Sequence, residues 1–482
     1  MKNSTQRSIN LPKTSIITLA SSILVIIAIM VSTSFPGINY NDKRITEVLT
    51  LVTIMFSSIF IPRKQVTKNK TFILLCFVFL LGLASSFLSI SPRHALIEQI
   101  TFIGLFTTII LISPIWKSKH FFFLVASTLI FSMLITEVVF FTSYLAYCIS
   151  GNNFSIHDFF PSFANVRFFN QYQIWTMPYI SVILLQKNTT VKKYNYIIWP
   201  IAVAWWLIFF STGSRGATLA ELTAFIVTWY FFKNQIKDFI LITVKLCFFG
   251  FISYQFLFNF LPYLIYNDTD TLLKSLELRN TTADRLFLWE KAYHFITQNP
   301  FLGIGPMHYA LSVTNDSDSL NSITHPHNSV LQWAAEWGVI SLLSVITLIY
   351  IAFKKWFIKY NPSSLSNIDK NRSYLVIATT ISVISAMIYS LLSGVIVMPS
   401  SQLTAIMPIS LMLYLYSPNT VQSSVKPCYL YKGFIIFIII LYFYLLIPDI
   451  INIFFNTHTT IEVHTHHPRF WLDGQFRPPT NQ

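Results

Sequence analysis

Long uncharged runs of apolar residues constrain the fold of this chain more than any other feature. Residues 14–34, TSIITLASSILVIIAIMVSTS, form the first run, and about 20 apolar residues suffice to cross a bilayer as a helix. Further runs lie near 46–61, 72–90, 100–115, 121–149, 174–185, 196–211, 217–232, 246–264, 338–353, 374–392, 403–416 and 433–453. They predict an all-α polytopic membrane helix bundle of about 12–13 transmembrane helices.

The charge composition supports this prediction and excludes a soluble protein. Charged residues make up 11% of the chain, against roughly 25% in a typical soluble domain. The 33 Lys and Arg exceed the 19 Asp and Glu, which gives a formal net charge of +14. In a soluble chain such an excess would suggest a nucleic-acid partner, so its distribution along the chain has to be examined.

The basic residues gather in alternate gaps between the predicted spans. PRKQVTKNK, WKSKH, QKNTTVKK, KNQIKD and the segment 354–372 all fall on one side when the N-terminus lies on that side. Loops rich in Lys and Arg stay in the cytoplasm, so we expect a cytoplasmic N-terminus. The first run is longer than a signal peptide needs and precedes no clear cleavage site, which favours a retained span. The net charge therefore reports orientation, and we expect no nucleic-acid partner.

This topology predicts the domain organisation. Residues 1–453 form the transmembrane domain, and the polar segment 265–337 is a large outer loop with helices of its own. Residues 454–482 form a short tail, also outside. The four cysteines are widely spaced, so the sequence indicates neither a disulfide framework nor a CxxC metal site.

The stretch HPHNSVLQWAAEWG, residues 325–338, carries the most informative motif. Pro326 disfavours helix at His325, whereas Asn328 is a good N-cap, so a helix is expected to begin near Asn328. His327 would lie at its entrance, where the helix dipole disfavours an imidazolium and favours a neutral base. An equally good interpretation is a histidine that only caps or hydrogen-bonds a loop.

The segment 284–310, DRLFLWEKAYHFITQNPFLGIGPMHYA, predicts a short amphipathic helix that ends at Asn299-Pro300. Leu286, Trp289, Tyr293 and Ile296 share one side of it. The glycines at 303 and 305 are not a dinucleotide fingerprint, because no strand precedes them and the third glycine is missing. From residue type alone, Arg285 is most simply a surface ion pair with Asp284 or Glu290.

Two further arginines lie at predicted outer ends of spans. STGSRGA, residues 211–217, is a tight connection in which Arg215 either snorkels to lipid headgroups or grips a phosphate through its planar fork. FANVRFFNQYQIWTMP, residues 163–178, places Arg167 among amides and aromatic side chains that suit a sugar. An aromatic belt at the membrane interface explains those aromatic residues equally well.

Together these motifs resemble the superfamily of O-antigen ligases, O-antigen polymerases and pilin-type O-linked oligosaccharyltransferases. The order is SRGA between two spans, R(x3)W and NP(x2)GIG in a large loop, then HPHNSVLQ(x3)EWG, over about residues 160–400. SGVIVMPSSQ, residues 393–402, and the histidine motif resemble the protein-glycosylating members. The short tail differs from the larger soluble extension that those members often have.

The resemblance implies a role for each residue of the motifs. His327 would be the catalytic base, and Arg215 and Arg285 would bind the donor diphosphate. Arg167 and Asn170 match an Asn-containing segment of the family more loosely, with Arg167 as a third diphosphate ligand. Asn328, His325 and Trp289 would support these groups.

The resemblance also implies the reaction and its location. The donor would be a glycan on undecaprenyl diphosphate, and the acceptor a hydroxyl of lipid A core or of a pilin-like protein. The reaction would take place at the periplasmic face of the bacterial inner membrane. We expect an inverting transfer without metal or cofactor, since two arginines would neutralise the leaving diphosphate. The acidic pairs Asp268/Asp270 and Asp316/Asp318 and the tail histidines 458, 464, 466 and 467 could instead bind a metal.

Two alternatives remain open on the sequence alone. An O-antigen polymerase would use a second lipid-linked repeat unit as its acceptor. About thirteen spans with charged residues inside the membrane also fit a lipid or glycan transporter, or flippase. The polar groups of a transporter are, however, expected near the middle of the membrane and in repeated halves.

Overall fold

The computed structural model describes residues 13–35, 38–60, 70–150, 156–160, 162–163, 165–186, 193–266, 281–311, 324–417, 429–455 and 470. The secondary structure of these residues is helical and contains no strand, which confirms the predicted all-α class.

Each predicted span falls on a long helix of the described chain. These helices are α1 (Lys13–Ser34), α2 (Tyr40–Ser58), α3 (Lys70–Leu88), α4 (Pro92–Ile112), α5 (Lys119–Ser150), α6 (Val166–Leu185), α8 (Asn195–Ser211), α9 (Arg215–Phe232), α10 (Lys237–Gln255), α16 (Val339–Lys359), α18 (Lys370–Ser390), α19 (Pro399–Tyr416) and α20 (Tyr429–Phe455). Eight described segments are long and apolar enough to cross a membrane by length and composition, one of them containing both α9 and α10. Helices α2, α6 and α19 are more polar, and α8 is shorter.

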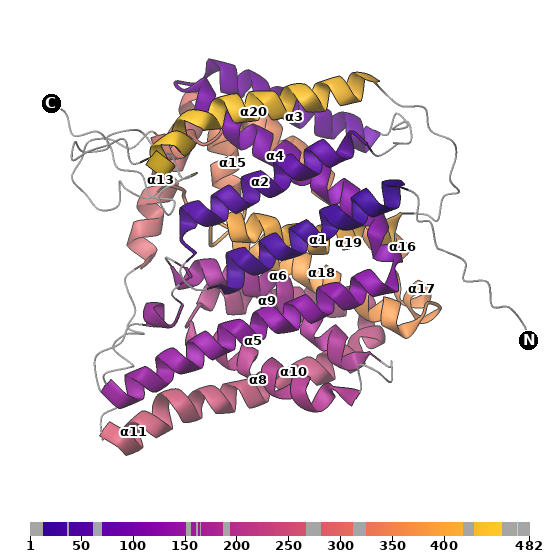
Figure 1. Ribbon diagram of the computed structural model, residues 1–482, viewed down its shortest axis with the longest axis vertical. Coiled ribbons are helices and arrows are strands. Elements are labelled where there is room, and N and C mark those ends of the chain that lie inside the picture. Colours follow the sequence, from indigo (N-terminus) through magenta and orange to yellow (C-terminus); the bar gives the residue numbers. More distant parts are fainter. Residues whose placement is uncertain are drawn as a thin grey trace, which may run out of the picture.

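The more polar helices α6 and α19 owe their composition to their place in the bundle. Helix α6 buries nearly all of its side chains, and it packs along α18, which in turn packs along α9. Figure 1 shows α6 and α18 in the middle of the bundle, with α3 and α20 along one side and α8 and α10 along the other. Polar side chains of these central helices therefore bond to neighbouring helices instead of facing lipid.

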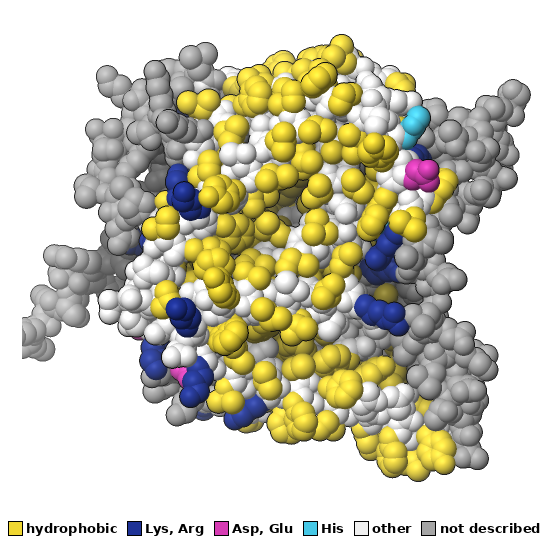
Figure 2. Space-filling model, turned by 180° about the vertical axis from the view of Figure 1, so that it is seen from behind, with side chains coloured by type: hydrophobic (Ala, Val, Ile, Leu, Met, Phe, Trp, Pro, Cys, Tyr) yellow, Lys and Arg dark blue, Asp and Glu magenta, His cyan; other side chains and the backbone are white. Residues whose placement is uncertain are grey.

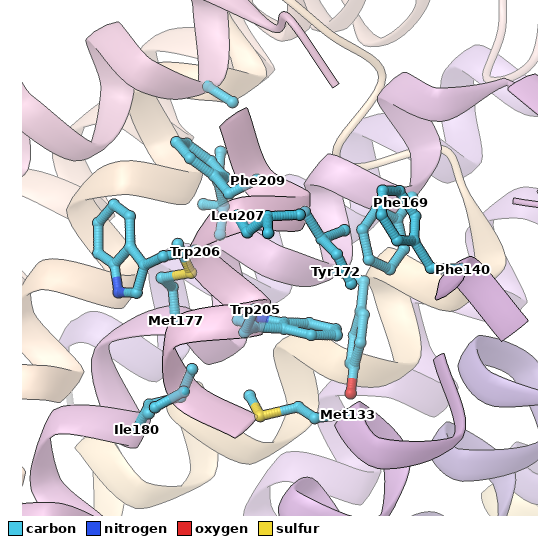
Figure 3. Packing of buried hydrophobic residues seen from close by; sticks show 14 of the residues in the cluster. Met133, Phe140, Phe169, Tyr172, Met177, Ile180, Trp205, Trp206, Leu207 and Phe209 are labelled. Atoms are coloured by element: carbon cyan, nitrogen blue, oxygen red, sulfur yellow. The ribbon is translucent and has the colours of Figure 1, made fainter. Parts of the chain in front are cut away.

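Aromatic side chains fill the centre of the bundle. Phe169 and Tyr172 of α6 meet Trp205 of α8 edge to face, with ring centroids 5.5 and 5.8 Å apart, as Figure 3 shows. Helices α8 and α10 approach closely because Gly250 has no side chain: a Cβ there would lie 2.4 Å from the Trp206 Cβ. Small residues at such crossings let membrane helices pack by van der Waals contact, since lipid offers no hydrophobic driving force.

Shorter helices connect the long ones. They are η1 (Ser113–Lys117), η2 (Ile156–Phe159), η3 (Lys233–Ile236), the π-helix η4 (Phe256–Phe260), α11 (Leu261–Tyr266), α13 (Thr281–Gln298), α14 (His308–Leu311), α15 (Ser329–Trp337) and α17 (Pro362–Ser366). Helices α13, α14 and α15 come from the predicted loop 265–337, and α13 lies at the end of the bundle opposite α17 (Figure 1). We call the end with α13 the site end.

The two ends of the bundle differ from its flanks. In Figure 2 basic side chains lie along two opposite edges of the molecule, and a broad band of hydrophobic side chains separates them. Around α17, at the end away from α13, lie Lys354, Lys355, Lys359, Lys370 and Arg372. This pattern is that of a protein whose hydrophobic flank faces lipid.

Candidate functional site

A glycine turn, residues 303–305, connects α13 to α14 and packs against the end of α15. This contact is so close that it leaves no room for side chains at Gly303. The Ile304 and Gly305 amides donate to the carbonyls of Ala335 (2.9 Å) and Glu336 (3.0 Å) at the end of α15. A Cβ on Gly303 would lie 2.5 Å from the Glu336 carbonyl, and Gly303 has a φ of +73°. The glycine pair therefore serves packing, in agreement with its failure to match a nucleotide-binding fingerprint.

Gly338 separates α15 from the membrane helix α16. Its φ is +81°, and a Cβ would lie 2.1 Å from the Phe301 carbonyl oxygen. The Val339 amide donates to the Pro300 carbonyl at 2.8 Å, so α16 starts anew beside the NPFLGIG turn. Helix α15 is therefore a separate helix that ends before α16 begins.

Helix α13 ends at Gln298, before Asn299-Pro300, as predicted. The side that it buries is different from the apolar side seen in the sequence. Leu286 and Tyr293 are 59% and 65% exposed, whereas Leu288, Ala292 and Phe295 are buried. The reason is that α13 packs against α15 through Ala292 and Phe295, with Ile296 at the edge of the contact, which leaves Leu286 and Tyr293 outside it.

His327 lies immediately before the N-terminus of α15, as predicted. Asn328 is the N-cap, and its side chain accepts hydrogen bonds from the amides of Val330 (3.0 Å) and Leu331 (3.1 Å). His327 itself has a φ of +52°, a conformation that is uncommon outside glycine and costs about 1–3 kcal/mol. Such strain is retained when the surrounding contacts fix the backbone.

Two neighbouring side chains supply those contacts. The Trp289 indole of α13 donates to the Pro326 carbonyl at 3.0 Å. The His327 amide donates to Nδ1 of the buried His325 at 3.3 Å, and the two imidazole rings meet edge to face at 4.2 Å. Trp289 and His325 thus position the His327 backbone. The His327 Nδ1 is buried and has no hydrogen-bond partner among the described residues.

The electrostatic surroundings keep His327 unprotonated. Burial, followed by the positive charges of Arg167 and Arg285, lowers the pKa of the His327 imidazole to about 4. A neutral imidazole at neutral pH can accept a proton. This site therefore offers a proton acceptor beside two cations.

Arg285 and Arg167 lie close enough to repel each other. The pKa of the Arg285 guanidinium is lowered first by burial and then by Arg167. Its Nη2 donates to the Leu392 carbonyl at 3.4 Å, and its Nε is buried without a partner in the described chain. No described ion pair includes Arg285, and Glu290 is exposed; the Asp284 side chain lies outside the described residues. Two cations without a described counter-ion form a site for an anion.

Arg215 differs from the expectation that two helices confine it. It is the first residue of α9, after the N-cap Ser214, and its side chain is exposed. The charges that lower the His327 pKa are those of Arg167 and Arg285. Arg215 still borders the site, because the neighbouring Gly216 packs against Tyr389 and Leu392, and the Leu392 carbonyl is the acceptor for Arg285.

Three amide side chains that follow Arg167 on α6, those of Asn170, Gln171 and Gln173, are fully buried. The Asn170 amide nitrogen donates to Gln173 (3.1 Å) and to Thr212 (3.0 Å), which belongs to the connection before Arg215. The Gln171 amide donates to Ser393 at 2.9 Å. Asn170 thus connects α6 to the Arg215 turn, and one polar atom each of Asn170, Gln171 and Gln173 has no partner in the described chain.

The segment 391–402 contacts the other site residues in a way that the sequence did not predict, although 393–402 resembles the protein-glycosylating members. Besides Leu392 and Ser393 it contributes Gly394, where a Cβ would lie 2.8 Å from Cε1 of His325. The hydroxyl of Tyr389 lies 3.3 Å from the Ser214 hydroxyl. These contacts join residues far apart in the chain, so periodicity and spacing could not predict them. Only the small residues of SGVIVMPSSQ gave a signal.

No group of three or more His, Cys, Asp or Glu side chains that could hold a metal occurs among the described residues. The acidic pairs at 268/270 and 316/318 and the tail histidines, the alternative metal ligands, lie outside the described residues.

Comparison with known proteins gives two kinds of match. Residues 200–346 match the family described as O-Antigen ligase. A candidate polysaccharide ligase of Rickettsia conorii is 26% identical over 240 residues, which cover 47% of this chain and 54% of the relative. Another, of Rickettsia felis, is 32% identical over 90 residues, 17% of this chain and 22% of the relative. The alignments thus span about half or less of these relatives. The family match contains Arg215, Arg285 and His327.

Proposed function

We propose that this chain, a member of the O-antigen ligase superfamily, is a membrane glycosyltransferase. It transfers a glycan from undecaprenyl diphosphate to an acceptor hydroxyl at the site end of the bundle. One observation supports this above the others: a neutral His327 lies within electrostatic reach of Arg167 and Arg285, which have no described acidic partner.

Glycosyl transfer from a diphosphate needs a base and a cationic site, and this arrangement supplies both. His327 removes the proton of the acceptor hydroxyl while the oxygen attacks the anomeric carbon. The new carbon–oxygen bond forms as the bond to the diphosphate oxygen breaks, so the configuration inverts. A positioned base contributes about 10²–10⁴ in rate.

The arginines stabilise the charge that develops on the leaving diphosphate. Arg167 and Arg285 lie beside His327 and act at the reacting phosphate. Arg215, exposed at the start of α9, binds the more distant part of the diphosphate at the rim. Because guanidinium groups perform the work that a divalent cation performs elsewhere, we propose that the transfer needs no metal.

The remaining residues hold these groups in place. Asn328 caps α15, Trp289 and His325 fix the backbone of His327, and Asn170 ties α6 to the Arg215 turn. We place the site on the periplasmic face of the inner membrane, since the described basic residues around α17 lie at the other end.

We propose a ligase that uses a hydroxyl of lipid A core or of a pilin-like protein. The description of the two relatives as candidate polysaccharide ligases agrees with a ligase. The two alternative functions are polymerisation of lipid-linked repeats and transport of the lipid, and the test below distinguishes both from a ligase.

The test uses the purified full chain in proteoliposomes with an undecaprenyl-diphosphate glycan, with and without EDTA. Lipid A core, a pilin-like protein and no added acceptor form three arms. Glycan appearing on either acceptor supports the ligase. Longer lipid-linked glycan in the arm without acceptor indicates a polymerase, and movement of the lipid between leaflets without any transfer indicates a transporter. Loss of transfer with EDTA would refute metal independence.

A further inference from the structure

A fully buried arginine at the site end uses every donor of its guanidinium. Arg44 of α2 is 2% exposed. Its Nη1 donates to Glu47 (2.5 Å) and Gln402 (2.7 Å), its Nη2 to the Tyr40 hydroxyl (3.1 Å) and the Val397 carbonyl (2.8 Å). Its Nε donates to the Phe470 carbonyl at 3.2 Å. An arginine has five N–H donors in a fixed plane, so all of them have acceptors here.

Two of these bonds hold the segment 391–402. Arg44 reaches it through the Val397 carbonyl and the side chain of Gln402, whose amide also donates to the Ile396 carbonyl at 2.7 Å. Within the segment the amides of Val397 and Met398 donate to the Gly394 carbonyl. These hydrogen bonds couple the position of Val397 to that of Gly394.

The same segment contacts the reacting groups on its other side. Gly394 packs against the ring of His325, which accepts the His327 amide. Leu392 accepts from Arg285 and Ser393 from Gln171. The segment thus lies between Arg44 and the pair His327 and Arg285, and it contacts groups on both sides.

The predicted tail completes the arrangement. The ring of Phe470 covers the Arg44 guanidinium at 4.4 Å, within the range of a cation–π contact, and is 3% exposed. Phe470 packs in one hydrophobic cluster with Met307, which follows the glycine turn, and with Tyr442 of α20. Phe470 therefore bonds Arg44 through its carbonyl and shields it through its ring.

Stability alone does not explain this network. A buried ion pair such as Arg44–Glu47 is often no more stabilising than apolar side chains of the same volume, because both charges lose their hydration. Unlike apolar side chains, an arginine fixes the positions of its acceptors, because its planar guanidinium binds five of them at once.

We propose that Arg44 and Phe470 are positioning residues that, through the segment 391–402, hold His325 and Arg285 where transfer requires them. Phe470, the described residue of the predicted tail beyond α20, then helps to support the active site. This inference rests on the proposed transferase function.

The test compares two double variants in proteoliposomes. Arg44→Met with Glu47→Leu replaces the network by apolar side chains. Arg93→Met with Asp449→Leu is the control, since Arg93 and Asp449 form another Arg–carboxylate pair, 2.6 Å apart, in which Arg93 is one-third exposed. Arg93 of α4 donates to Leu445 and Asp449 of α20, neither of which belongs to 391–402. We expect the first variant to melt at a lower temperature, because the carbonyls of Val397 and Phe470 lose their donor. Measured well below that temperature, its kcat should fall about 100-fold, the effect of a small misplacement of reacting groups, with KM for the lipid-linked glycan unchanged. The control keeps its kcat.

The proposal is overturned if kcat is unchanged in the first variant or falls equally in the control. It is also overturned if KM rises while kcat stays the same. Phe470→Ala, which removes only the ring, serves if the double variant does not fold; we expect a smaller loss of kcat, and no loss refutes the role of the tail. Failure of the transferase function itself is separable. Wild-type chain without transfer refutes that function, whereas hydrogen exchange tests the positioning: Phe470→Ala must speed exchange at 394–398 and 325–327, and unchanged rates refute it.

Discussion

The acid limb of the pH–rate profile tests the electrostatics of the site in detail, and Arg167→Gln is the perturbation that isolates it. The pKa of His327 falls from an ordinary 6.5 to about 4, first through burial and then through Arg167 and Arg285. A cation disfavours the imidazolium, so removing one raises the pKa. We expect the acid limb of kcat/KM to move upward in Arg167→Gln and to stop short of 6.5, because burial remains.

The magnitude follows from the same shift. With a pKa of about 4, roughly nine-tenths of His327 is unprotonated at pH 5, and each pKa unit corresponds to about 1.4 kcal/mol. The wild-type rate should therefore be flat from pH 8 to about pH 5 and fall only below that. In the variant the fall begins at a higher pH, in addition to the loss of diphosphate binding at all pH values.

Binding of the donor should have the same effect on the pKa of His327 as removal of part of the nearby positive charge. A bound diphosphate neutralises Arg167 and Arg285, so the pKa of His327 rises in the complex. Because kcat/KM reports the free enzyme and kcat the complex, the acid limb of kcat should lie at higher pH than that of kcat/KM. Initial rates of glycan transfer in proteoliposomes from about pH 3 to 8, a range that includes the pKa of about 4, measure both. Arg93→Gln is the control, since Arg93 pairs with Asp449. An acid limb that stays in place or moves downward in Arg167→Gln refutes the electrostatic argument.

Three further variants test other parts of the site. Arg285→Lys keeps the charge but loses the planar fork, so we expect kcat/KM to fall about 10-fold; a wild-type value would reduce Arg285 to a point charge. Trp289→Phe removes the hydrogen bond to Pro326, worth about 1 kcal/mol, and should lower kcat several-fold with little change in KM; an unchanged kcat would contradict its positioning role. Gly338→Ala places a Cβ against the Phe301 carbonyl at φ +81° and should lower stability by about 1–3 kcal/mol, visible as a lower melting temperature; equal melting would show that the turn can relax.

Much of the local structure at the site was predictable from the sequence. Asn328 as an N-cap and the end of α13 before Asn299-Pro300 both follow from capping and proline rules that act over a few residues. The spans were predictable for a similar reason, since each run of apolar residues crosses the membrane by itself.

The features that were not predictable depend on contacts between distant segments. Arg167 is a loose match to the family pattern, yet its charge lowers the pKa of His327, while the better-matched Arg215 is exposed. The contact of Gly394 with His325 and the burial of Arg44 by Phe470 join segments separated by tens to hundreds of residues. Spacing along one chain carries no information about such pairs. The buried side of α13 was unpredictable for the same reason, because it depends on the packing of α13 against α15.

The most direct test of the central claim is the rate of glycan transfer by His327→Ala in proteoliposomes. His294→Ala, on the exposed side of α13, is the matched control for a histidine of the same loop. If His327 is the base, its replacement should lower kcat by about 10²–10⁴ and abolish the acid limb, with donor binding and melting temperature kept. Transfer by His327→Ala at the rate of the wild type and of His294→Ala would contradict the account.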